Sequence, residues 1–182
     1  MIVYVVIAIV ILLILFVISQ YNGLVKARNR VKTNWAQIDV QLKKRADLIP
    51  NLVGTVKGYA KHESSTMEAV IKARNSYVSA DSIDGKMEAS NQITGALSHL
   101  FALSESYPDL KANTNFMALQ DELMNLEDKI AYSRQFYNDT VYSYMNKLEM
   151  FPSSIIASIF NFEPYGYFEV DEEDKKNVQV KF

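Results

Sequence analysis

The chain opens with an unbroken apolar segment. Residues 2–18, IVYVVIAIVILLILFVI, are all apolar or Tyr and carry no charge. A helix that rises about 1.5 Å per residue needs roughly 17 to 25 such residues to cross the hydrocarbon core of a bilayer. The pattern therefore predicts a transmembrane anchor over residues 1–20.

A cleaved signal peptide is the alternative interpretation of this segment. Such a peptide has a basic start, a shorter apolar stretch and a small-residue cleavage site. Here no Lys or Arg precedes the apolar run, and the VISQYN that follows it contains no A-x-A site. We therefore expect an uncleaved anchor.

After this segment, apolar positions recur every three or four residues instead of continuously. The mean spacing of about 3.5 residues is the period of helices that pack at shallow angles. Pro50 interrupts the pattern without shifting it, so we expect a kink there, because a proline inside a helix costs about 3 kcal/mol. The positions of this stripe are Leu24, Arg28, Val31, Trp35, Ile38, Leu42, Arg45, Ile49, Leu52, Val56 and Tyr59.

Three further helices follow from the same periodicity. The second begins at SSTME, where Ser65 and Glu68 fit a capping box, and the third spans about 87–106 after a turn at 81–85. The fourth runs from about 115 to 150, and SIIASIF adds one or two helical turns. The sequence thus predicts an all-α protein, in which the transmembrane helix precedes an elongated antiparallel four-helix bundle over residues 21–160 and an extended acidic tail over 161–182.

Charge is distributed unevenly along the chain. Residues 26–61 hold nine Lys or Arg against two Asp, whereas the chain from His62 onward is acidic. Four of the cations lie directly after the apolar segment, and the positive-inside rule then predicts a cytoplasmic body with a short N-terminus outside the cell. These topology residues are Lys26, Arg28, Arg30 and Lys32.

Besides Arg28, two further arginines occupy positions of the apolar stripes. Arg45 lies on the first stripe and Arg134 on the comparable stripe of the fourth helix. A charge at a core position is costly unless it is paired and hydrogen-bonded. We therefore predict a polar network that joins the first and fourth helices and fixes their register; the alternative is that each Arg extends its head group to water. The predicted network contains Asp39, Arg45, Asp47, Arg134 and Asn138.

The residues that carry common chemistries are absent from the sequence or wrongly spaced. There is no cysteine, and neither His62 nor His99 has a Glu three residues before it, as carboxylate-bridged metal bundles require. The acidic run 171–174 lacks the glycine and spacing of a calcium loop, and the basic run 43–45 lacks interleaved aromatic residues. We expect no metal, cofactor, small-molecule substrate or nucleic acid.

The order of several motifs is similar to that of a known family. After the apolar segment come YNGLVKARNRV and QIDVQLKKRADLIPNLVGTVKGYAKHE, and later LKANTNFMALQDEL, EDKIAYSRQFYND, FPSSIIASIF and YGYFEVDEEDKK. In these motifs the chain resembles the LemA family of bacterial membrane proteins. The resemblance implies a single-pass protein of the bacterial inner membrane with a helical bundle and an unassigned molecular activity, and some family members are linked to the organisation of internal membranes.

Two functions are compatible with these patterns. The first is a membrane-anchored scaffold or adaptor that is not an enzyme and that associates with the lipid bilayer, with copies of itself or with other membrane proteins. The second is an enzyme of unrecognised type, whose site would need to gather on an open cleft. The tail aromatics would form either a lid over the bundle or a docking strip. The candidate enzyme residues are Asp39, Asp47, Glu127, Asp128 and Arg134, and the tail aromatics are Phe162, Tyr165, Tyr167 and Phe168.

Overall fold

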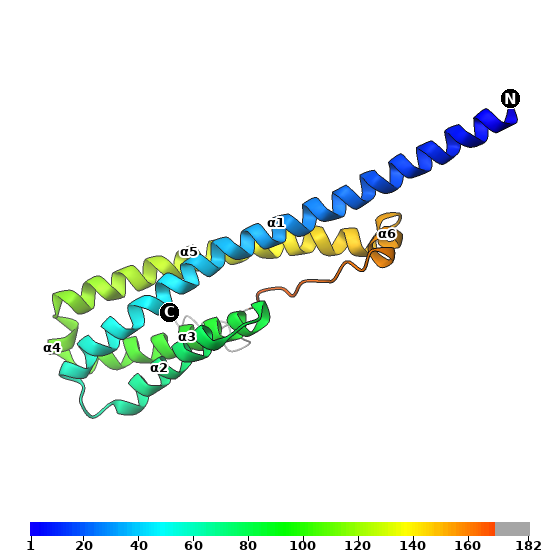
Figure 1. Ribbon diagram of the computed structural model, residues 1–182. Coiled ribbons are helices and arrows are strands. Elements are labelled where there is room, and N and C mark those ends of the chain that lie inside the picture. Colours follow the sequence, from blue (N-terminus) through cyan, green and yellow to red (C-terminus); the bar gives the residue numbers. More distant parts are fainter. Residues whose placement is uncertain (170–182) are drawn as a thin grey trace, which may run out of the picture. The chain divides into compact units, whose positions relative to one another are not determined.

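The structure, a computed structural model, describes residues 1–169, and every regular element in this range is an α-helix (Figure 1). The all-α prediction is confirmed for this part of the chain. The helices are α1 (Ile2–Tyr59), α2 (Ser64–Ser79), α3 (Ile83–Ser104), α4 (Pro108–Lys111), α5 (Thr114–Glu149) and α6 (Ser153–Ile159).

The apolar segment and the basic segment after it form one continuous helix. Helix α1 has 58 residues, and its most apolar stretch is long enough to cross a membrane, with none of it buried by the rest of the described chain. Pro50 lies inside α1 and does not end it. The heptad-like stripe of the sequence therefore belongs to the same helix as the predicted anchor.

The chain divides into two compact units, each built from segments distant in sequence. Unit 1 comprises Met1–Ile38 and Ser133–Tyr167, and the described part of unit 2 comprises Asp39–Tyr132 with Phe168 and Glu169. Helices α1 and α5 each contribute one part to either unit.

Unit 1 packs aromatic side chains of α5 against α1. The Trp35 and Tyr137 rings lie 5.7 Å apart, and both side chains are buried. Tyr137 and Tyr144 donate hydrogen bonds to the carbonyl oxygens of Gly166 and Glu163, at 3.0 and 2.8 Å. The described part of the tail in this unit is therefore held by backbone hydrogen bonds to α5 tyrosines.

The described part of unit 2 contains four long helical segments that bury apolar side chains, as the predicted bundle requires, together with the short helix α4. The segments are the C-terminal part of α1, helices α2 and α3, and the N-terminal part of α5. Their core side chains include Leu42, Ile49, Leu52, Met67, Val70, Ile93, Leu97, Leu100, Phe116, Leu123 and Leu126.

Helix α2 begins within SSTME, as predicted, but its cap and the start of α3 differ from the sequence prediction. The capping box is wrong, because α2 begins at Ser64, before Ser65, and its start has no side-chain cap. The turn predicted at 81–85 is instead the start of α3: the Ser82 hydroxyl accepts a hydrogen bond from the Gly85 N–H at 3.0 Å. This bond satisfies one of the free N–H groups at the helix start, so the helix begins at Ile83.

Candidate functional site

The candidate site in unit 2 is built around a fully buried arginine. Arg45 has no exposed area although it lies on the apolar stripe of α1, where neighbouring stripe positions hold Leu42 and Ile49. Burying a charge of this kind is costly unless its donors are hydrogen-bonded. The stripe position thus forces the guanidinium to find partners inside the bundle.

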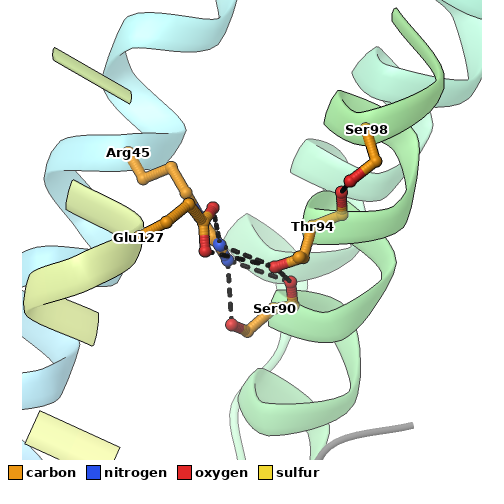
Figure 2. Close-up of polar contacts among 5 residues, drawn as sticks. All are labelled: Arg45, Ser90, Thr94, Ser98 and Glu127. Atoms are coloured by element: carbon orange, nitrogen blue, oxygen red, sulfur yellow. Dashed lines mark hydrogen bonds and ion pairs between the residues drawn. The ribbon is translucent and has the colours of Figure 1, made fainter. Parts of the chain in front are cut away.

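Those partners come from α3 and α5 (Figure 2). Arg45 Nη1 forms an ion pair with Glu127 Oε1 and donates a hydrogen bond to Thr94 Oγ1 at 2.9 Å. Arg45 Nη2 donates to the Ser90 carbonyl oxygen at 2.9 Å and to Ser90 Oγ at 2.8 Å. One side chain of α1 therefore connects two other helices of unit 2.

The hydroxyl groups extend this network along α3. Thr94 Oγ1 lies 3.3 Å from the Ser90 carbonyl oxygen and 3.4 Å from Glu127 Oε2. Ser90 and Thr94 are one helical turn apart, so both face the same side of α3. Glu127 is one-third exposed, whereas Arg45 is fully buried, so the carboxylate carries the network from the core to the surface.

The predicted network residues take several different partners. Asp39 accepts hydrogen bonds from Lys86 Nζ and the Tyr77 hydroxyl, both at 2.9 Å, and Asp47 is exposed. Arg134 and Asn138 are half-buried residues of unit 1 and have interactions there or elsewhere in the chain. That Asp39, Asp47, Arg134 and Asn138 fix helix register together with Arg45 stays a prediction.

Sequence reasoning missed Ser90 and Thr94 as members of the site. Ser90 lies three residues before Ile93 and seven before Leu97, which places it on the buried face of α3. A small polar residue at such a position was an available signal, because it leaves room and acceptors for a long side chain from another helix.

Asp39 also influences a buried tyrosine. Tyr77 is almost fully buried, and Lys86 lies 5.8 Å from its ring centroid. Burial, together with the hydrogen bond to the Asp39 carboxylate, raises the pKa of Tyr77. The hydroxyl therefore stays protonated and acts as a donor to Asp39.

A cleft of about 250 Å³ lies beside the Arg45 network. Glu127 and Asp128 line it, whereas Asp39 and Asp47 do not, and Arg134 belongs to unit 1. Within residues 1–169, no group of three or more His, Asp or Glu side chains is placed to hold a metal ion. The candidate enzyme residues are thus only partly gathered on this cleft, whose lining residues are Thr94, Leu97, Ser98, Phe101, Leu123, Met124, Glu127 and Asp128.

The predicted topology residues lie in unit 1 at the start of the basic part of α1. Lys26 and Arg30 line a cleft of about 250 Å³ together with Lys147 of α5. Arg28 is half-buried, with its guanidinium carbon 5.1 Å from the centroid of the Phe162 ring, and Lys32 is exposed. Three cations of this region therefore face one opening on the surface of unit 1.

Comparison with known proteins finds matches along most of the chain. The model of the LemA family matches residues 34–182. The chain is 24% identical to Protein LemA of Metamycoplasma hominis over 168 residues, which cover 90% of this chain and 75% of that protein. It is also 24% identical to the magnetosome protein MamQ of Magnetospirillum gryphiswaldense, over 83% of this chain and 65% of that protein. A magnetosome protein of Paramagnetospirillum magneticum, MamQ 2, is 23% identical over 84% of the chain and 65% of its own length.

Proposed function

Because the chain belongs to the LemA family and carries a long apolar helical segment that no other described part of the chain buries, we propose that it is a membrane-anchored helical scaffold or adaptor. In this proposal the body associates with further copies of the chain or with other membrane proteins, and it catalyses no reaction.

The observation that carries the proposal is the exposure of the N-terminal part of α1. Its large apolar side chains are exposed from Ile2 to Phe16, and no other described segment covers them. Removing one such side chain from water is worth about 1.5 to 3 kcal/mol. A bilayer provides that environment without any partner protein, and the helix continues without a break into the packed body.

The charges that follow this segment support one orientation. Lys26, Arg28, Arg30 and Lys32 come directly after it, and cytoplasmic flanks are enriched in Lys and Arg. The body then lies in the cytoplasm at the bacterial inner membrane, with the short N-terminus outside.

The state of two carboxylates in unit 2 supports the proposal that the chain is not an enzyme. Glu127 is held by Arg45, and Asp39 is held by Lys86 and Tyr77. An acid or base needs to reach a substrate proton across an open cleft. Glu127 does line a cleft, but both carboxylates are engaged by side chains of neighbouring helices, as structural groups are.

Cross-linking of the full-length chain in intact bacterial membranes tests the proposed function. A ladder of self-cross-links supports a scaffold, and one abundant foreign partner supports an adaptor. Release of the body by a salt wash, or removal of the first 18 residues from the mature protein, would contradict the anchor. Orientation is read from a Met124→Cys variant, because the chain has no native cysteine and this position is exposed. In intact cells an impermeant maleimide should not label it.

A further inference from the structure

Helix α6 exposes large apolar side chains, as do Met150 and Phe151 shortly before it. Phe151 is 80% exposed, Ile155 51% and Ile159 64%, and their spacing of four residues places Ile155 and Ile159 on one face of α6. Met150 and Phe160 are also exposed. No charged residue occurs between Met150 and Phe162, so this surface has no ionic groups of its own.

The opposite face of α6 determines where this surface lies. Ile156 and Ala157 are buried against Leu24, and Val17 and Tyr21 pack on the same cluster. The Tyr21 and Phe160 rings are 4.8 Å apart. Helix α6 is therefore fixed to the stretch of α1 between Val17 and Leu24, where the apolar segment ends.

This level matches the boundary between hydrocarbon and water if α1 spans the bilayer, so the inference rests on the proposed anchor. The stretch from Val17 to Leu24 rises about 10 Å along α1. The headgroup region on each side of a bilayer is roughly 5 to 8 Å thick. Helix α6 is then beside the headgroup layer and cannot avoid it, since its buried face holds it against α1.

We infer that α6, together with Met150 and Phe151, is an interfacial helix that inserts its exposed apolar face into the bilayer that α1 spans. The partner is the boundary between phospholipid headgroups and acyl chains, where amphipathic helices bury one face about 5 to 10 Å deep. Tyrosine is enriched in this layer, and the Tyr21 ring packs against Phe160 of α6 there.

The charges around α6 agree with this placement. Lys26, Arg30 and Lys147 line the cleft beside Gly23 and form no ion pair with a described residue. They are free to face headgroup phosphates. The nearest carboxylates in sequence are Glu149 and Glu163. They flank the uncharged residues 150–162 on either side and are exposed.

Depth-dependent fluorescence quenching tests this inference on the full-length chain. Single cysteines replace Ile155 or Ile159, each carries an environment-sensitive dye, and the protein is reconstituted into vesicles of phosphatidylethanolamine and phosphatidylglycerol. Leu12→Cys, in the apolar segment, is the control for deep burial in lipid. Met124→Cys, an exposed apolar position of unit 2, is the control for water. Circular dichroism confirms that each variant keeps its helices.

We expect dyes at 155 and 159 to be quenched most by a spin label near the headgroups, the dye at 12 by a label deep in the acyl chains, and the dye at 124 by iodide. If positions 155 and 159 behave like 124 while 12 is deep, the interfacial helix is refuted and the anchor stands. Shielding of 155 and 159 from both lipid labels and iodide would assign this face to a protein contact, which also refutes it. A dye at 12 that no lipid label quenches would refute the anchor, and the interfacial helix with it.

Discussion

Arg74 of α2 donates a hydrogen bond from its Nε to the carbonyl oxygen of Ala46 in α1, at 3.0 Å. Ala46 lies four residues before Pro50, whose ring nitrogen has no hydrogen to donate. The carbonyl that Pro50 deprives of its helical partner is thus bonded by a side chain from another helix. Since Ala46 is buried, this bond explains how α1 tolerates a proline in its interior.

Replacing Arg74 should therefore destabilise the protein, because Pro50 has no N–H that could bond the Ala46 carbonyl instead. We expect Arg74→Met to lower the free energy of unfolding by about 1 to 3 kcal/mol, because the Ala46 carbonyl loses its donor. In a Pro50→Ala background the restored N–H takes over, so the same substitution should cost clearly less. Denaturant unfolding of the four proteins in detergent micelles measures both costs, and equal costs in the two backgrounds would contradict the relationship.

Glu127 should matter more than its neighbour Asp128. We expect Glu127→Ala to lower the free energy of unfolding by about 3 kcal/mol, because Arg45 stays buried without its counter-charge. This is the lower end of the range for a broken buried ion pair, since Glu127 itself is partly exposed. Asp128 lines the same cleft, is exposed and serves as the matched control, with an expected effect under about 0.5 kcal/mol. Similar losses in the two variants would show that Arg45 does not depend on Glu127.

Arg45→Leu tests whether the network fixes the arrangement of the helices. If the network specifies register, the variant should change its oligomeric state or lose cooperative unfolding, as happens when a specifying polar core residue is removed. Light scattering and thermal melting in detergent measure the two properties. A large gain in stability with an unchanged oligomeric state would leave the arginine without a specifying role.

The raised pKa of Tyr77 predicts that the protein loses stability at alkaline pH. Its pKa is raised in the folded protein, so above the ordinary tyrosine pKa of about 10 the unfolded chain releases this proton first. The contribution is complete below pH 10 and declines as pH rises toward the folded-state pKa. We expect Tyr77→Phe to cost about 1 kcal/mol at neutral pH and to flatten this decline, while Tyr142→Phe, at an exposed position, leaves it unchanged. Urea unfolding at pH 8 and pH 11 gives the comparison.

Gly54 and Gly58 lie one turn apart on α1, and a Cβ added at either would meet nothing within 4 Å. Glycine in a helix interior is about 0.5 to 1 kcal/mol less favourable than alanine. The double substitution to alanine should therefore raise the free energy of unfolding by about 1 to 2 kcal/mol without altering self-cross-linking. Fewer self-cross-links would instead show that another copy packs closely on these glycines.

Periodicity predicted the helices of the body closely, and it predicted that Arg45 falls on an apolar stripe. It could not predict which groups Arg45 would meet. The hydrogen-bond partners Ser90, Thr94 and Glu127 are 45, 49 and 82 residues away in sequence. The missing side-chain cap of α2 and the start of α3 at Ile83 also escaped prediction, because each depends on a single capping interaction.

The sequence alone determined the properties that depend on neighbours along the chain: an apolar segment of membrane-spanning length, a basic continuation and helices with one apolar face. Only the tertiary structure decided which distant groups meet, namely Glu127 with Arg45, Arg74 with the carbonyl that Pro50 leaves free, and α6 with the end of the apolar segment. The physical reason is that helical periodicity arises from contacts three and four residues apart, whereas a buried charge or carbonyl is satisfied by whatever group packing brings within hydrogen-bond distance.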